Sequence, residues 1–485
     1  MDLIKTGIGI TKTFRNVSRL REIVLIFARH GFDEFISGSI TQLIPNFVLP
    51  KSKKSIKKEL EEEGHKDWGD LLGFRLRKCF EELGPAFVKF GQLLSSREDI
   101  FDESFIAQMK ILRDQVKPVP FTESVKIINE SLGEPWKNVF SEIDPNPIGT
   151  ASIGVVYRGK LLDGTKVVLK VQRPNIKKVM LTDFSIMNFA STQIEKVSDE
   201  IRFLGISRIV KDFSISLQNE LNFNIEALNS EKLRKNLKVH DPEELFYIPT
   251  VYKEHSSERV LVMELLDGTP FSEAEHIEGQ VENIAPLLQT GLNTFIKTFL
   301  TDGFFHADLH GGNFFYLNNG KIGLIDFGLM GHLSKKGREN FIAIIYSLLT
   351  YNFESLVYEF LDVAEYEDVP DVDKLISDIK YALGPFIGLT VQQTNFTVVL
   401  SAIVTTLREH QIFLPREWFV VFRALMTLDG VGKSLGMDFD IFAILEKDIH
   451  GLIKSNFKKE EFMEDALWLG KDILSSSRML PRHLR

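Results

Sequence analysis

The sequence predicts an α+β fold of two lobes, a small lobe that contains a β-sheet and a larger, mostly helical lobe. Two short β-rich runs, 155–159 and 166–170, lie on either side of Asp163-Gly164, a dipeptide typical of hairpin turns. A third β-rich run covers residues 259–264. Helical periodicity dominates residues 175–240 and the chain after Ser334. Strand-rich and helix-rich stretches are therefore largely separated along the chain.

The remaining elements follow from periodicity and from helix-breaking residues. Residues 68–136 are expected to be helical, with breaks at Gly84-Pro85 and at Lys117-Pro118. A further helix is expected at 283–300, with Pro286 tolerated in its first turn, before a short strand at 321–325. Four segments result: a basic amphipathic region with a charged linker (1–65), a helical extension (66–140), the small lobe (141–268) and the helical lobe (269–485).

Composition excludes several classes of function. The 485 residues carry a net charge of −9, which argues against a nucleic-acid-binding protein. Cys79 is the one cysteine, so internal disulfides and multi-cysteine metal sites are excluded, and a reducing, cytoplasmic compartment is expected. No apolar run suits a signal peptide or a transmembrane helix.

The N-terminal region differs in charge from the rest. Residues 1–58 contain 11 Lys and Arg against 4 Asp and Glu, a net charge of +7. Leu20, Ile23, Val24 and Phe27 recur at helical spacing beside arginines. Such a helix either lies on an anionic membrane surface, placing the protein at the inner face of the membrane, or packs on the protein's own core.

Residues 149–156 match the kinase phosphate loop G-x-G-x-x-G-x-V except at Ala151. Backbone N–H groups of such a loop approach phosphates closely. Lys170 occupies the position of the kinase lysine that binds the α- and β-phosphates. Either match alone is weak. The candidate nucleotide-binding residues of the loop are Gly149, Thr150, Ala151, Ser152, Ile153 and Gly154.

The motif that follows is specific. His306-Ala-Asp308-Leu-His310-Gly-Gly-Asn313 keeps the five-residue spacing from Asp to Asn of the kinase catalytic loop, and Asp326-Phe-Gly follows a predicted strand. Asp308 is the candidate for orienting or deprotonating an attacking hydroxyl. Asn313 and Asp326 offer the oxygen ligands that Mg²⁺ prefers. These motifs occur in kinase order, so the α+β prediction becomes a bilobal protein-kinase-like fold that binds ATP with Mg²⁺ between its lobes.

Two further features concern the substrates. The segment 264–267 follows the predicted strand and is the candidate hinge between the lobes, where adenine would bind. Its first residue, Glu264, is the candidate adenine-binding residue. No A-P-E motif follows Asp326-Phe-Gly, and the chain enters a helix at about Ser334. Ordinary kinases seat a peptide on the segment that is missing here, so a protein substrate is hard to accommodate.

Beyond the kinase motifs, the chain resembles the UbiB (aarF-domain) family of atypical kinase-like proteins over residues 15–440. Lys89-Phe-Gly-Gln92 matches its K-x-G-Q motif, and His306–Asn313 is similar to its H-A-D-x-H-P-G-N motif. The resemblance implies that the segment with Lys89 and Gln92 covers the site where a peptide would dock. It also implies ATPase activity tied to membrane lipids and a role in isoprenoid-quinone (ubiquinone) biosynthesis, with anionic lipid or a quinone precursor as partner. Protein partners are not implied.

The chain departs from the family pattern at three places. Gly149-Thr150 stands where the family usually has Ala-Ala, Gly311 replaces a proline, and Asn222 replaces the acidic end of an E-x-D motif. The glutamate partner of Lys170 is assigned to Glu226, on a helix that also carries Glu220. At 100° per residue one helix aims Glu226 at Lys170 and Glu220 at another neighbour, which the resemblance identifies as the helix with Lys89.

Two other functions stay open at this point. A small-molecule phosphotransferase of the aminoglycoside or choline kinase type shares the H-x-D-x-x-x-x-N motif but does not need the segment from Lys89 to Gln92. A non-catalytic ATP-binding scaffold would bind nucleotide without releasing phosphate.

Overall fold

A computed structural model describes most of the chain, in segments separated by short gaps. The described residues are 17–32, 67–95, 97, 100–112, 118–196, 205–273, 281–364, 366, 369–386, 396–434 and 441–456. The charged linker before residue 67 and the chain after residue 456 lie outside them, as do Lys117 and the predicted break there.

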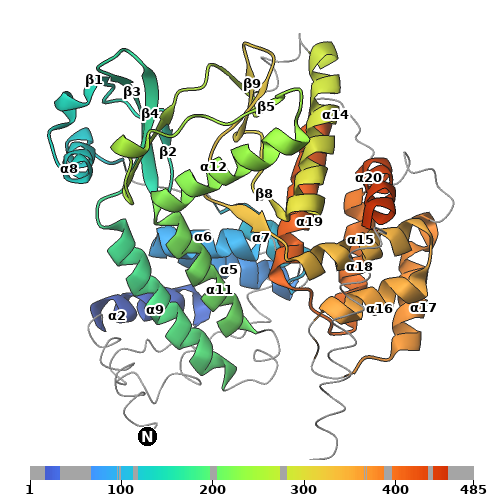
Figure 1. Cartoon of the computed structure of the whole chain (residues 1–485). Coiled ribbons are helices and arrows are strands. Elements are labelled where there is room, and N and C mark those ends of the chain that lie inside the picture. The colour runs from blue at the N-terminus through green and yellow to red at the C-terminus, as the bar shows by residue number, and fades with distance from the viewer. Residues whose placement is uncertain are drawn as a thin grey trace, which may run out of the picture.

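The small lobe is built on an antiparallel sheet in the order β1-β3-β4-β6 (Figure 1). The predicted hairpin is confirmed: Gly164 in its turn has a φ of 94°, a conformation that favours glycine. One face of the sheet packs on α8 (Phe121–Leu132) through Val167, Leu169 and Val171. The other face carries Lys170. The strands are β1 (Phe140–Ile143), β2 (Gly149–Thr150), β3 (Gly154–Leu161), β4 (Lys166–Gln172) and β6 (Val260–Glu264).

Helices cover the face of the sheet that carries Lys170. Val168, Leu261 and Met263 of the sheet belong to the same apolar core as residues of these helices. The break predicted at Gly84-Pro85 is confirmed, with a φ of 99° at Gly84. In Figure 1 the extension helices lie behind the helices that connect β4 to β6. The helices are α5 (Trp68–Leu83), α6 (Pro85–Leu94), α7 (Glu103–Lys110), α9 (Ile176–Glu195), α11 (Ile206–Glu220) and α12 (Phe223–His240).

The amphipathic N-terminal helix, α2 (Val17–Phe27), packs on the protein itself. Ile23, Val24 and Ile26 are buried, and Ile23 and Ile26 join the core formed by the extension helices. Arg19 forms an ion pair with Asp183 of α9 at 2.8 Å. Leu20 and Phe27 are half-buried. The packing of Ile23 and Ile26 agrees with the second interpretation, and binding to an anionic membrane stays a prediction.

Replacing Arg19 by alanine is expected to lower the free energy of unfolding by about 3–5 kcal/mol, because Asp183 is fully buried and would keep an uncompensated charge. Arg29→Ala is the matched control. Its ion pair with Glu82 is exposed, so the loss should stay below about 1 kcal/mol. Urea unfolding measures both values. Equal, small losses would contradict the docking of α2.

The large lobe begins with α14 (Val281–Lys297), which starts two residues before the predicted helix. Pro286 therefore lies inside the helix rather than in its first turn, and that prediction is wrong: without an N–H group, Pro286 cannot complete the helical hydrogen bond to the residue four positions earlier. Short strands lie before and after α14, and those after it flank the predicted catalytic motifs. They are β5 (Phe246–Tyr247), β7 (Gly268–Pro270), β8 (Phe304–His306), β9 (Phe314–Leu317), β10 (Ile322–Leu324) and β11 (Met330–His332).

The rest of the described chain is helical, as predicted. These helices share one large core with α14 and with the buried phenylalanines that flank the catalytic motifs. No helix in the described ranges is long and apolar enough to cross a membrane. The helices, drawn in orange and red in Figure 1, are α15 (Lys335–Leu349), α16 (Phe353–Val363), α17 (Val372–Leu383), α18 (Phe396–Glu409), α19 (Arg416–Ser434) and α20 (Ile441–Asn456).

Candidate active site

A cavity of about 770 Å³ lies between the two lobes and the helical extension. The cavity is lined by the predicted phosphate loop, the extension, β4, the helices α11 and α12, the catalytic loop, the Asp326-Phe-Gly segment and the C-terminal helices. Among the predicted site residues, the following line this cavity: Lys89, Gln92, Ala151, Ser152, Ile153, Gly154, Lys170, Glu226, Asp308 and Asp326.

Lys170 lies at the centre of a three-residue cluster. Its Nζ donates to both carboxylate oxygens of Glu226 at 2.9 Å and to Oδ1 of Asp326 at 3.2 Å. Strand β4 alternates its side chains, so Lys170 shares the face of Val168 and points toward α12, where Glu226 lies in the first turn. The predicted pairing of Lys170 with Glu226 is thus present in the structure.

A second ion pair joins the extension to α11: Lys89 Nζ lies 2.9 Å from Glu220 Oε2. The two glutamates do not share one helix as predicted. The chain breaks between α11 and α12, where the side chain of Asn222 caps α12 by accepting a hydrogen bond from the Asn224 N–H at 3.1 Å. This break, rather than the angle around a single helix, sends Glu220 and Glu226 to different lysines. Asn222 acts here as a helix cap and not as a charged group.

The protonation of the cluster reflects burial and charge together. Burial acts to lower the pKa of Lys170, but Asp326 and Glu226 outweigh it and raise that pKa above its ordinary value. Burial also acts to raise the pKa of Asp326, and the Lys170 ammonium outweighs it and holds the pKa well below the usual range. For Glu226 burial prevails and raises the pKa to about 7.

A pKa of about 7 at Glu226 predicts that nucleotide affinity rises between pH 6 and pH 8. Glu226 is about one-tenth ionised at pH 6 and about nine-tenths at pH 8, and the ionised form holds Lys170 in place. The dissociation constant of an ATP analogue is measured across this range for the unmodified chain and for Glu226→Gln. The variant should lose the part of the pH dependence that comes from Glu226. Because the nucleotide's own titration is common to both proteins, equal pH profiles would show that Glu226 does not titrate there.

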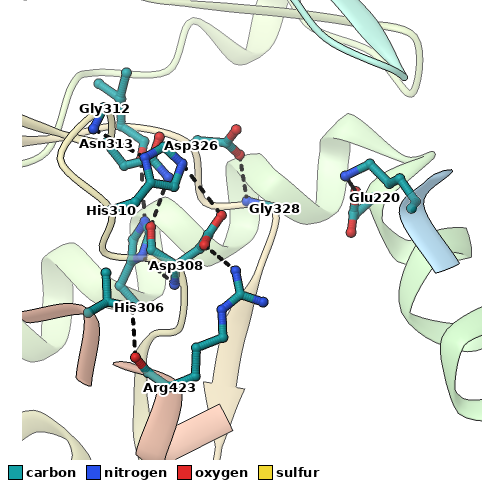
Figure 2. A network of polar contacts seen from close by, with 12 residues as sticks. Glu220, His306, Asp308, His310, Gly312, Asn313, Asp326, Gly328 and Arg423 are labelled. Atoms are coloured by element: carbon teal, nitrogen blue, oxygen red, sulfur yellow. Dashed lines mark hydrogen bonds and ion pairs between the residues drawn. The ribbon is translucent and has the colours of Figure 1, made fainter. Parts of the chain in front are cut away.

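The catalytic loop is held from within (Figure 2). Asn313 donates through its side-chain amide to the backbone carbonyl of Asp308 at 2.9 Å. His306 is buried and accepts from the Asp308 N–H at 3.2 Å, and its Nε2 lies 3.3 Å from the carbonyl of Ile325. Burial lowers the pKa of His306, so the ring braces the loop as a neutral group. His310 Nε2 lies 3.8 Å from Asp308 Oδ2.

The Asp326-Phe-Gly segment adopts a tight turn. Asp326 has a φ of 59°, and its Oδ1 accepts from the Gly328 N–H at 3.2 Å. Asn229 of α12 donates to the carbonyl of Phe327 at 2.9 Å, so the helix that carries Glu226 also holds this segment. Strand β11 begins at Met330 and α15 at Lys335, which leaves no room for a peptide-seating loop, as the sequence predicts.

The phosphate loop is only partly in the cavity. Gly149 and Thr150 form β2 against β3 and do not line it, whereas Ala151 to Gly154 do. Arg173 Nε donates to the Ala151 carbonyl at 2.8 Å and ties the loop to the end of β4. Ser152 is 1% exposed, and its Oγ has no hydrogen-bond partner.

Glu264, the candidate adenine hinge, lies away from the cavity lining. Its carboxylate accepts from the Tyr247 hydroxyl at 2.8 Å and from the Thr250 N–H at 3.1 Å. Burial and the Glu264 carboxylate raise the pKa of Tyr247 to about 12, which keeps the hydroxyl protonated as a donor. The Glu264 side chain therefore holds β6 to the preceding segment.

Sequence reasoning missed Arg423. Its Nη2 lies 2.5 Å from Asp308 Oδ1, and it lines the cavity from α19 (Figure 2). Arg423 lies 115 residues after Asp308 in a helix without a kinase motif, so no local signal marks it.

The fold and the site define a protein of the atypical kinase-like class. The model of the ABC1 atypical kinase-like domain matches residues 111–359, and that of the UbiB helical domain matches residues 379–440. The chain belongs to the UbiB family of atypical kinase-like proteins.

Similar proteins include members of the same family. The chain is 30% identical to the probable protein kinase UbiB of Shewanella frigidimarina, over 85% of this chain and 79% of that protein. It is 28% identical to the uncharacterized protein sll0005 of Synechocystis, over 76% of this chain but 54% of that protein, so it spans about half of that relative. A solved structure of Rv3197 from Mycobacterium tuberculosis, described as a complex with erythromycin, is similar in fold: the TM-score is 0.51 at 22% identity, covering 81% of this chain and 98% of that one.

Proposed function

We propose that this protein binds ATP with Mg²⁺ in the cavity between its lobes and transfers the γ-phosphoryl group to water or to a small hydroxyl compound. One observation carries the proposal: Lys170, Glu226, Asp308 and Asp326, separated by up to 156 residues, converge on one cavity. Three carboxyl groups and one ammonium group are costly to hold together inside a protein. Their convergence therefore favours a site built for a charged ligand.

The residues present suit a nucleotide and its metal. The unpartnered Ser152 hydroxyl is buried in the phosphate loop and can donate to a phosphate oxygen. Asp326 lines the cavity and offers a carboxylate, and Mg²⁺ typically takes one or two protein ligands with the phosphates. Asn313 is buried beside Asp308, outside the cavity lining, and is the candidate second ligand. In the described part of the chain no group of three or more acidic, histidine or cysteine side chains forms a separate metal site. Mg²⁺, when bound, would neutralise phosphate charge.

Each side chain then has a defined task. Lys170 holds the α- and β-phosphates, and Glu226 keeps Lys170 in place. Asp308 orients the nucleophile and accepts its proton as the new bond to the γ-phosphorus forms. The bond between the γ-phosphorus and the bridging oxygen breaks, and its electron pair leaves with ADP. Catalysis consists of positioning and charge stabilisation.

The acceptor side of the cavity favours a small or lipidic hydroxyl compound over a peptide. Leu112 of the extension and Leu400, Val404 and Met426 of the C-terminal helices give the cavity apolar walls. The ion pair from Lys89 to Glu220 ties the extension to the lobe beside the cavity. These features, with the family resemblance, support a role in isoprenoid-quinone biosynthesis or membrane lipid handling.

The test is release of inorganic phosphate from ATP by the purified chain with Mg²⁺, with and without an isoprenoid phenol or vesicles of anionic phospholipid. We expect Mg²⁺-dependent release that the phenol or the vesicles stimulate. Binding of ATP without release would favour the scaffold alternative. Efficient transfer to a soluble amino sugar or choline would favour the small-molecule phosphotransferase.

A further inference from the structure

The catalytic loop brings no strong cation to the reacting phosphoryl group. Residues 306–313 contain neither lysine nor arginine. His310 is the loop's candidate, but its Nδ1 accepts from the Gly312 N–H at 3.1 Å and its side chain is 56% exposed. In phosphoryl transfer, negative charge spreads over the γ-phosphoryl oxygens, and a positioned cation stabilises it. Beyond the charge that Mg²⁺ would supply, any further cation has to come from another part of the chain.

The structure places such a cation beside Asp308. Arg423 reaches from α19 into the cavity and bonds Asp308 Oδ1 at 2.5 Å. The nucleophile must lie between Asp308 and the γ-phosphorus, so a guanidinium in contact with Asp308 is within one side-chain rearrangement of the γ-phosphoryl oxygens. Its side chain is 41% exposed, which leaves it room to turn.

Lys170 and Lys89 are poorly suited to this task. Lys170 is engaged by Glu226 and Asp326, and its expected partners are the α- and β-phosphates. Lys89 pairs with Glu220, which Figure 2 shows well apart from Asp308. Arginine also presents a planar fork of donors that matches phosphate oxygens and stays charged at all working pH values.

We infer that Arg423 is a further catalytic residue that binds the γ-phosphoryl group of ATP. In this structure it pairs with Asp308. With ATP bound it turns to the γ-phosphoryl oxygens and leaves Asp308 to accept the proton of the nucleophile. Arg423 lies at 379–440, in the region of the UbiB helical domain and outside the kinase-like match. The helical domain thereby completes the active site. This inference rests on the proposed function.

The experiment compares the affinities of the full chain for a non-hydrolysable ATP analogue and for ADP, both with Mg²⁺. In Arg423→Gln we expect analogue affinity to fall about tenfold or more and ADP affinity to change less than about twofold, because ADP lacks the γ-phosphoryl group. Phosphate release should fall as well. Arg423→Lys should restore part of the analogue affinity. Lys433→Gln removes the same charge from an exposed site on α19 and should leave both affinities unchanged.

The outcomes are distinct. A parallel loss of analogue and ADP affinity in Arg423→Gln, with the thermal unfolding temperature lowered, would show a structural role and overturn the inference. Faster phosphate release in Arg423→Gln would show that the arginine restrains Asp308, which also overturns it. Absence of nucleotide binding by the unmodified chain would instead contradict the proposed function, and the inference with it.

Discussion

Asp326→Asn is expected to reduce phosphate release from ATP by about 10²–10³-fold or more. The carboxylate carries two tasks at once. Among the candidate metal-binding residues, Asp326 is the one with a negatively charged oxygen ligand for Mg²⁺. Its Oδ1 also lies 3.2 Å from Lys170 Nζ. An amide keeps the shape but removes the charge, so it weakens the metal site and frees Lys170 from one of two partners. Steady-state phosphate release with saturating Mg²⁺ measures the effect.

Asp373→Asn provides the matched control, because Asp373 is exposed in the first turn of α17 and lies outside the cavity lining. Its rate should equal that of the unmodified chain. If Asp326→Asn also released phosphate at the unmodified rate, the metal role of Asp326 would be wrong and the scaffold alternative would gain support.

Lys170→Met is expected both to abolish phosphate release and to destabilise the protein. The substitution removes the group that holds the α- and β-phosphates. It also leaves Glu226, whose side chain is 4% exposed, without its cation. Breaking a buried pair in this way typically costs about 3–5 kcal/mol, an upper figure here because a carboxyl with a pKa of about 7 can take up a proton instead. Urea unfolding and phosphate release are measured on the same samples.

The double variant Lys170→Met with Glu226→Gln separates the two effects. Without a buried charge, most of the lost stability should return, while phosphate release should stay absent. A double variant that regains activity would show that Lys170 does not hold phosphate. One that stays as unstable as Lys170→Met would show that the unpaired carboxylate is not the cause.

Local sequence carried much of the prediction. The hairpin at 154–172 follows from alternation and an Asp-Gly turn, which are properties of a few adjacent residues. Asp308, Asn313 and Asp326 were identifiable because their spacing along one loop and one turn fixes their relative positions. The pairing of Lys170 with Glu226 could also be predicted, because a strand and a helix each present a side chain in a known direction.

Sequence reasoning was limited where a contact with a distant part of the chain decides what a residue or helix does. Periodicity could not show that Asn222 would cap a new helix and separate Glu220 from Glu226. An amphipathic helix has the same pattern whether its apolar face meets lipid or protein, and only the structure shows that Ile23 and Ile26 of α2 pack in the core of the extension helices. Glu264 was assigned as the adenine hinge from its place after a strand; the structure adds that its carboxylate accepts a hydrogen bond from Tyr247, and the hinge role stays a prediction.

The sequence by itself therefore determined the class of fold and the chemistry of the catalytic loop, because these depend on residues close together along the chain. The tertiary structure decided which lysine each glutamate pairs with, where α2 lies, and that Arg423 faces Asp308 across 115 positions. Contacts of that kind depend on how separate elements pack against one another, and no local pattern of residues encodes the result.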